Sequence, residues 1–382
     1  MQIDQMQNIV ELVEGNTKLL VPKESLETNA PPMQPAFFNP RAKLSRDFSI
    51  VAYSAFIQNF KGPKTFLDCL SGIGARSIRV ANELKMMERV FINDVNPSAI
   101  ELAKNSALLN NTDKCEFSEN EACRFLSLHS KKENRGAIVD IDPFGSPSRY
   151  FDCGIRATSH GGLLSVTATD LPVLHGLYND ACQRRYYGIP ARTEYGNEIA
   201  LRLILGCLHL VAGRLDVKII PLFVQNNMHY YRAYVKILVK TDSEDKMGYI
   251  IHCKACGHRK VQKEKSNSCE ICKAKAESAG PLWIGEMFDK IFVDEMLLEQ
   301  TKFTIDKSCE KTLLKCQKEI GMPPSFFTLD EIARRMRDAP KSLEKTIEKL
   351  QKSGFDASPT SLNSSGFKAS ARIDEVMQLL KI

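Results

Sequence analysis

The chain has 382 residues, of which 43% are hydrophobic and 26% charged, and its net charge is +6. This composition excludes a disordered or fibrous chain, and the length suits two folded domains, which we expect at residues 1–240 and 241–382. The longest apolar stretch, 199–213, contains Arg202 and His209, so it favours a buried helix over a membrane span. The N-terminus lacks the apolar core of a signal peptide, and we expect a cytoplasmic protein with no membrane partner.

Between residues 64 and 240, short apolar runs alternate with helical segments. Asn96 and Pro97 supply an N-cap and a first-turn proline for a helix that extends to Leu109. Nearly continuous apolar strands separated by helices predict an α/β domain with a parallel sheet covered on both faces, which the last two runs could close as an antiparallel hairpin. The predicted strands are 65–70, 89–94, 136–142, 161–167, 217–224 and 232–239.

A glycine-containing turn follows the first predicted strand. Asp68 lies near the end of that strand, and Gly72 and Gly74 come where the backbone must pass close to a ligand at the carboxyl edge of a sheet. Asp94 ends the next strand, about 20 residues beyond the glycines, where a carboxylate can accept hydrogen bonds from both hydroxyls of a ribose. Together these residues predict a site for a ligand that contains adenosine.

Two features distinguish the possible cofactors. A dinucleotide site needs a third glycine, with helix amides facing a pyrophosphate, but Ser77 holds that position and Arg76 lies at the helix start. S-adenosylmethionine has no phosphate and needs a partner for its methionine carboxylate, which Arg76 or Arg46 could supply. The sequence therefore favours S-adenosylmethionine over a nicotinamide cofactor.

The stretch 140–145, Asp-Ile-Asp-Pro-Phe-Gly, carries the groups best suited to catalysis. Methylation of an exocyclic amine is difficult because the nitrogen lone pair is delocalised into the ring. The Asp142 carboxylate or a neighbouring backbone carbonyl could hold the amine hydrogens so that the lone pair faces the methyl group. Pro143 would fix these acceptors, and Phe144 offers a flat face to a base taken out of its stack. A simple turn is the alternative, but the position after two cofactor-type strands favours catalysis.

These motifs together closely resemble those of the tRNA (guanine-26-N2)-dimethyltransferases, and the resemblance covers most of the chain. It implies a Rossmann-like class I methyltransferase domain that transfers methyl groups from S-adenosylmethionine to the N2 amine of guanine 26. It also implies tRNA as the partner, and we expect a monomer. The motifs that carry the resemblance are 38–40, 45–47, 67–76, 93–97, 140–147, 167–176, 187–188 and 198–202.

The resemblance also implies roles for single residues. Asp142 would act at the amine, Phe144 would stack on guanine, and Asp170 would line the base pocket. Near the C-terminus, Lys368 is a predicted tRNA contact, whereas Pro359 and Ser361 stand where the family tends to carry a basic residue and a histidine. The predicted cofactor contacts are Arg46, Asp68, Gly72, Gly74, Arg76, Asp94, Val95, Glu121, Ala122 and Asp140.

Four of the twelve cysteines form two Cys-x-x-Cys pairs, Cys253 with Cys256 and Cys269 with Cys272, separated by 12 residues. Two such knuckles can bind a structural zinc ion through four thiolates, with redox-active pairs as the competing interpretation. The eight scattered cysteines are expected to act as small apolar residues. Between Cys253 and Lys275 there are seven Lys or Arg residues and two Glu, an excess that is typical of phosphate contact.

The remainder of the second domain is predicted to be mainly helical. One helix should begin after Thr328 as its N-cap, and a second should cover 342–352 and end at Gly354. These two helices with basic faces fit a helix-turn-helix or winged-helix unit, but a charged helical hairpin is an equal alternative.

Two other functions are compatible with this sequence. One is a different nucleic-acid amine methyltransferase, acting on guanine N2 of ribosomal RNA or on adenine N6, since the chemistry at the amine is the same. The other is a non-catalytic RNA-binding protein built around the zinc ribbon, which would bind no methyl donor.

Overall fold

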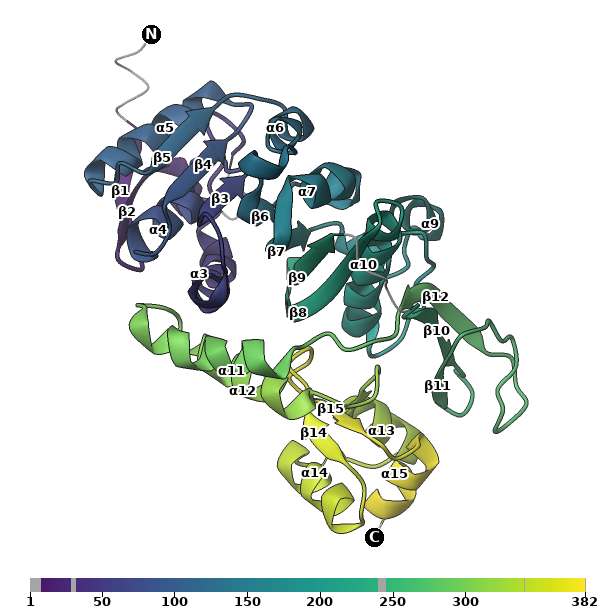
Figure 1. Ribbon diagram of the computed structural model, residues 1–382. Helices are drawn as coiled ribbons and strands as arrows, with labels where there is room; N and C mark the ends of the chain where they lie inside the picture. The colour runs from purple at the N-terminus through teal and green to yellow at the C-terminus, as the bar shows by residue number, and fades with distance from the viewer. Residues whose placement is uncertain (1–7, 29–31, 240–244, 340, 382) are drawn as a thin grey trace.

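The computed structural model describes residues 8–28, 32–239, 245–339 and 341–381. Its largest sheet has seven strands in the order β5-β4-β3-β6-β7-β9-β8 (Figure 1). The strands from β5 to β7 are parallel, and β9 and β8 continue the sheet as an antiparallel hairpin, so both predictions are confirmed. The strands are β3 (Thr65–Asp68), β4 (Arg89–Asn93), β5 (Cys115–Ser118), β6 (Gly136–Ile141), β7 (Thr158–Ala168), β8 (Val217–Asn227) and β9 (Tyr230–Val239).

Two features of this domain are missing from the predicted elements. The edge strand β5 has the sequence Cys-Glu-Phe-Ser, which contains no apolar run. An N-terminal hairpin of β1 (Ile9–Glu14) and β2 (Thr17–Pro22) precedes the short helix α2 (Glu24–Glu27). Strand β2 packs against α4 and α5, so the hairpin covers the helical layer and is not part of the large sheet.

Helix α10 (Gly196–Gly213) contains the apolar stretch 199–213. Within the described residues it is the one helix long and apolar enough to span a membrane, but 83% of it is buried inside the protein. It is therefore a core helix, as predicted, and it packs against β8, β9 and β12. The other helices of this region are α3 (Lys43–Asn59), α4 (Ala75–Glu83), α5 (Pro97–Leu109), α6 (Ala122–Leu128), α7 (Phe151–Ala157), α8 (Leu171–Leu174) and α9 (Asn179–Tyr186).

The disulfide between Cys123 of α6 and Cys153 of α7 differs from the expectation that the scattered cysteines are only packing residues. The two helices follow different strands of the parallel sheet and pack against each other. For this pair the prediction was wrong, because the 30-residue sequence separation gives no sign that the two helices are neighbours.

The predicted boundary between residues 240 and 241 lies outside the described residues. Beyond it, β10 (Met247–His252), β11 (Arg259–Gln262) and β12 (Glu277–Trp283) form a three-stranded antiparallel sheet in the order β11-β10-β12. Strand β12 packs against α10, and α11 (Lys290–Glu299) packs against both α3 and α12 (Ser308–Glu319). The second region therefore lies directly against the first.

The last segment has a hydrophobic core of its own. Its elements are grouped together at the C-terminal end of the chain (Figure 1). A helix pair is followed by a β-hairpin, and the hairpin joins a third strand, β13, in a sheet of order β13-β15-β14. This is the arrangement of a winged-helix unit, so the alternative of a simple helical hairpin is wrong. The strands of this segment are short, and the region after the cysteine-rich stretch is mainly helical, as predicted. The elements are β13 (Phe327–Thr328), α13 (Leu329–Met336), α14 (Leu343–Lys352), β14 (Ala357–Pro359), β15 (Gly366–Ala369) and α15 (Ile373–Leu380).

Candidate active site

Three carboxylates lie at the carboxyl edge of the parallel sheet, as the sequence predicts. Asp68 ends β3 and Asp140 lies near the end of β6, and the two residues are direct neighbours in the register of these strands. Asp94 follows β4 on the other side of β3. Ligands of open α/β sheets bind outside this edge, so the fold itself places the candidate site here.

The glycine turn has a conformation that supports the predicted cofactor site. Gly72 and Gly74 have φ values of 53° and 73°, in the left-handed region, and Gly74 begins α4. A Cβ on Gly74 would lie 2.9 Å from the Cβ of Ala103, so the turn packs too closely against α5 for any other residue. The amide of Gly72 donates to Asp94 Oδ2 at 2.8 Å, which holds the carboxylate beside the turn.

The surroundings of Asp94 fit an adenosine group. The amide of Asn96 binds Asp94 Oδ1 at 2.9 Å, and each carboxylate oxygen keeps lone-pair capacity for a ribose hydroxyl. The next residue, Val95, has a side chain that is 70% exposed, so an apolar surface is uncovered beside the carboxylate. A carboxylate that accepts hydrogen bonds from ribose hydroxyls, next to an apolar surface for the adenine ring, suits an adenine nucleoside.

Glu121 and Ala122 lie at the start of α6. The Glu121 carboxylate accepts a hydrogen bond from the Arg124 amide at 3.0 Å and so caps the helix. Asn93, which was not predicted as a site residue, connects this segment to the glycine turn. Its Nδ2 donates to the carbonyls of Cys69 and Asn120, at 3.0 and 2.9 Å. Its position at the end of the strand that precedes Asp94 is the sequence feature that could have identified it.

The two arginines predicted to bind the methionine carboxylate already have protein partners. Arg46 donates to both oxygens of Glu14, at 2.6 and 2.8 Å. Arg76 lies with its Nε 3.1 Å from Asp140 Oδ2, and its Nη2 donates to Asp142. The Arg46 pair was not predicted because Glu14 belongs to the missed hairpin, and the Arg76 pairs were not predicted because Asp140 and Asp142 belong to a segment distant in the sequence. Direct contact of either arginine with bound S-adenosylmethionine stays a prediction. It requires that the arginine binds the methionine carboxylate in addition to, or in place of, its protein carboxylate.

Asp140 is the centre of a buried charge cluster. Burial alone would raise its pKa, but Arg232 and Arg76 beside it hold the pKa below its usual value. Arg232 Nη2 lies 2.5 Å from Asp140 Oδ2, and the hydroxyl of Tyr53 donates to the same oxygen. For Asp68, burial and the neighbouring negative charge of Asp140 raise the pKa to about 7.

The predicted catalytic residues form the exposed end of this cluster. The Asp142 side chain is 31% exposed, and both Arg76 and Arg232 approach its Oδ2. Pro143 follows, and the Phe144 ring is 62% exposed and contacts Phe37 edge-on at 4.7 Å between centroids. A half-open carboxylate therefore stands next to an uncovered aromatic face.

Asp170 lies next to the segment that contains Asp142. Its carboxylate accepts hydrogen bonds from Tyr186 at 2.7 Å and Arg185 at 3.0 Å. The Tyr186 hydroxyl in turn accepts a hydrogen bond from Ser146, at 2.9 Å, two residues after Phe144. The structure therefore brings Asp170 to the same loop cluster as the catalytic segment, where its role in base binding stays a prediction.

Lys368 has a different environment from the one predicted for a tRNA contact. The residue is buried, and its Nζ lies 2.8 Å from Glu198 of α10 and 3.7 Å from Glu319 of α12. In this conformation it has no surface with which to bind a phosphate. Ser361, at one of the positions that depart from the family pattern, donates to the same Glu319. Both residues therefore join the winged-helix unit to the rest of the protein.

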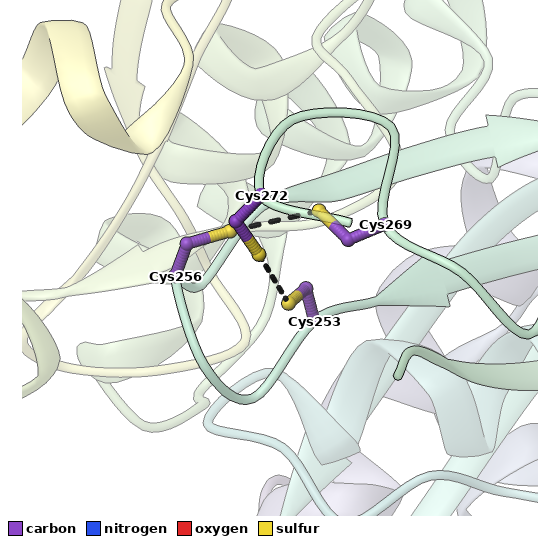
Figure 2. Close-up of side chains that lie close together, drawn as sticks. All are labelled: Cys253, Cys256, Cys269 and Cys272. Atoms are coloured by element: carbon purple, nitrogen blue, oxygen red, sulfur yellow. Dashed lines mark hydrogen bonds between the residues drawn. The ribbon is translucent and has the colours of Figure 1, made fainter. Parts of the chain in front are cut away.

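The four clustered cysteines converge as predicted (Figure 2). Their sulfur atoms lie within 4.8 Å of one another, with 3.5 Å between Cys253 and Cys272 and 3.6 Å between Cys256 and Cys269. Four thiolates at about 2.3 Å from a tetrahedral zinc ion would lie about 3.8 Å apart. The amide of Gly257 donates to the Cys253 carbonyl at 2.7 Å, which closes the first knuckle. The cluster therefore fits a structural zinc ion.

A parallel sheet with a tight glycine turn and a ribose-type carboxylate is the architecture of Rossmann-like class I methyltransferases, and Asp142 with Phe144 adds an exposed acceptor beside an aromatic face. The comparison with known proteins identifies the group. The profile of the N2,N2-dimethylguanosine tRNA methyltransferases matches residues 15–381, and the chain belongs to this family.

Individual relatives match over nearly their whole length. The tRNA (guanine(26)-N(2))-dimethyltransferases of Methanobrevibacter smithii and Methanococcus maripaludis are 31% and 34% identical to this chain, and each alignment covers 96% of both proteins. A solved structure of Trm1 from Pyrococcus horikoshii with S-adenosyl-L-methionine superposes with a TM-score of 0.84. That structure is 29% identical, and the alignment covers 97% of this chain and 99% of the other.

Proposed function

We propose that this protein transfers methyl groups from S-adenosylmethionine to the exocyclic N2 amine of guanine 26 in tRNA, giving N2,N2-dimethylguanosine. The observation that carries the proposal is the segment from Asp142 to Phe144, in which a half-exposed carboxylate and an uncovered ring lie beside the cofactor-type turn. Family membership and the names of the relatives support the substrate, and tRNA is therefore the proposed partner.

The residues that would hold the donor are those around the glycine turn. Asp94 would accept the ribose hydroxyls, Val95 and Ala122 would contact the adenine, and Arg76 is the candidate for the methionine carboxylate. The bound donor supplies an electrophilic methyl group on a sulfonium centre. The packing of Gly74 against α5 keeps the turn rigid, and a preformed site lowers the entropic cost of bringing the reactants together.

Asp142 would act on the amine. Its Oδ1 would accept an N–H hydrogen bond from N2 and so orient the nitrogen lone pair out of conjugation with the ring. When the nitrogen gains a methyl group it must lose one proton, and the same carboxylate is the acceptor within reach. Arg76 holds Oδ2, so the free oxygen points in one direction. Phe144 would stack on the extruded guanine, which pairing and stacking otherwise make inaccessible.

The zinc ribbon and the winged-helix unit would bind the body of the tRNA. The ribbon carries an excess of lysine and arginine around its four cysteines, and such side chains neutralise phosphates. Lys368 does not belong to this surface. A monomeric state and a cytoplasmic location remain predictions.

The test is methyl transfer from labelled S-adenosylmethionine to unmodified tRNA transcripts, with the products resolved as nucleosides. We expect label in N2,N2-dimethylguanosine, and its loss both with the Asp142→Ala variant and with a transcript that carries adenine at position 26. Label in another nucleoside would keep the enzyme class and replace the substrate. If no label is transferred and S-adenosylmethionine does not bind, the remaining hypothesis is a non-catalytic RNA-binding protein built around the zinc ribbon.

A further inference from the structure

Arg232 lies behind the candidate catalytic carboxylate and has no role in the reaction described so far. It is on β9, the antiparallel strand next to β7, and its side chain is completely buried. A buried guanidinium is costly unless all its donors are paired, and replacement of such ion pairs by apolar residues is often neutral or stabilising. Stability alone is therefore a weak reason for an arginine at this position.

Its hydrogen bonds use the whole guanidinium group. Nε lies 2.9 Å from the Tyr234 hydroxyl, and Nη1 donates to Thr167. Nη2 lies 2.5 Å from Asp140 Oδ2, 2.6 Å from Ser165 and 2.8 Å from the Tyr53 hydroxyl. Partners on three strands and one helix thus fix the planar guanidinium in one orientation, which a lysine ammonium could not reproduce.

The contacts lead from Arg232 to Asp142 by two routes. Arg232 Nη1 lies 3.7 Å from Asp142 Oδ2, and Arg232 also binds Asp140 Oδ2. The same Asp140 oxygen lies 3.1 Å from Arg76 Nε, while Arg76 Nη2 binds Asp142 Oδ2. Two arginines therefore bridge the same two carboxylates, and Arg232 is the one that is completely buried.

We propose that Arg232 is a positioning residue for methyl transfer, which fixes Asp140 and Arg76 so that the Asp142 carboxylate presents Oδ1 to the amine. The inference rests on the proposed function. It requires no direct contact between Arg232 and either substrate, and Arg76 keeps its own pair with Asp142 when Arg232 is changed. Loss of Arg232 should therefore slow the chemical step much more than it weakens binding of S-adenosylmethionine through Arg76, and it should leave tRNA binding nearly unchanged. Displacements of about 1 Å can cost on the order of 100-fold in rate.

The experiment uses Arg232→Lys in the full-length protein, with single-turnover methylation of a tRNA transcript and calorimetric binding of S-adenosylmethionine. We expect a rate loss on the order of 10- to 100-fold with a donor dissociation constant within about threefold of wild type. The matched control is Arg202→Lys. Arg202 is also buried, but its partners are Glu198 and the carbonyls of Trp283 and Gly285, in place of the carboxylates at the sheet edge. Its variant should methylate at the wild-type rate.

Tyr53→Phe tests the same idea in case the lysine variant does not fold. It removes one hydrogen bond to Asp140 without changing a charge, and we expect a rate loss of about 3- to 10-fold. A folded Arg232→Lys variant with the wild-type rate, or equal losses of rate and donor affinity, would overturn the positioning role, as would an unchanged rate in Tyr53→Phe. Failure of the proposed function would appear differently, as a wild-type protein that does not modify guanine 26.

Discussion

Replacement of Phe144 by alanine should weaken methylation strongly and stability only slightly. The ring is 62% exposed and has one aromatic contact, edge-on with Phe37. Loss of that contact costs about 0.5–1.5 kcal/mol at most. A base stacked on the ring contributes about 1–3 kcal/mol, which corresponds to about 5- to 150-fold in the catalytic efficiency toward tRNA.

The measurement is kcat/KM for unmodified tRNA, together with the midpoint of thermal unfolding. Phe144→Tyr keeps a flat ring and should retain most of the activity. Leu108→Ala is the matched control. Leu108 is 73% exposed, but it lies near the C-terminal end of α5 and is distant in sequence from the catalytic segment. Stacking by Phe144 is refuted if Phe144→Ala methylates tRNA as efficiently as wild type, or if Phe144→Tyr is as defective as the alanine variant.

Three further predictions concern the rest of the structure. Metal analysis should find one zinc per chain, lost in Cys269→Ser and kept in Cys115→Ser, whose sulfur lies outside the cluster. The raised pKa of Asp68, about 7, means that its contribution to stability is complete below its unfolded pKa of 3.8 and is lost as pH rises through 7. The difference in melting temperature between wild type and Asp68→Asn should therefore become less favourable to wild type as the pH rises from 4 to 7. A difference that stays constant would contradict a buried, protonated Asp68 carboxyl. Lys368→Met should lose about 3–5 kcal/mol of stability because the buried Glu319 loses its cation, although Glu198 keeps its ion pair with Arg202, and the salt dependence of tRNA binding should not change.

The sequence predicted the parts of this protein that are determined locally. Buried parallel strands are continuous apolar runs, so β3, β4, β6 and β7 were found. The four cysteines were found because knuckle spacing is set by short-range geometry. The carboxylates at the sheet edge were found because parallel strands all present their carboxyl ends on the same side.

Contacts between distant segments were not predictable in this way. Arg46 and Arg76 were predicted to contact the methyl donor, but their protein partners Glu14 and Asp142 were not predicted, because these reach them through tertiary packing that no motif records. Lys368 was similarly assigned to the RNA from its place in a motif, whereas the fold turns it inward. A motif specifies the residue type and the sequence position of a basic side chain, but its partner depends on which helices and strands the fold brings together.

The buried pair between Lys368 and Glu198 has a consequence for how a target nucleotide would be chosen. It ties β15 to α10, while β12 and α11 pack against the catalytic domain at two more places. A joint held by buried charges and helix packing resists bending, so the winged-helix unit and Asp142 stay at one separation. Under the proposed function such a frame would act as a ruler. An RNA bound at its far end by the winged-helix unit would present to Asp142 the nucleotide at a set distance, so that selection would follow from length.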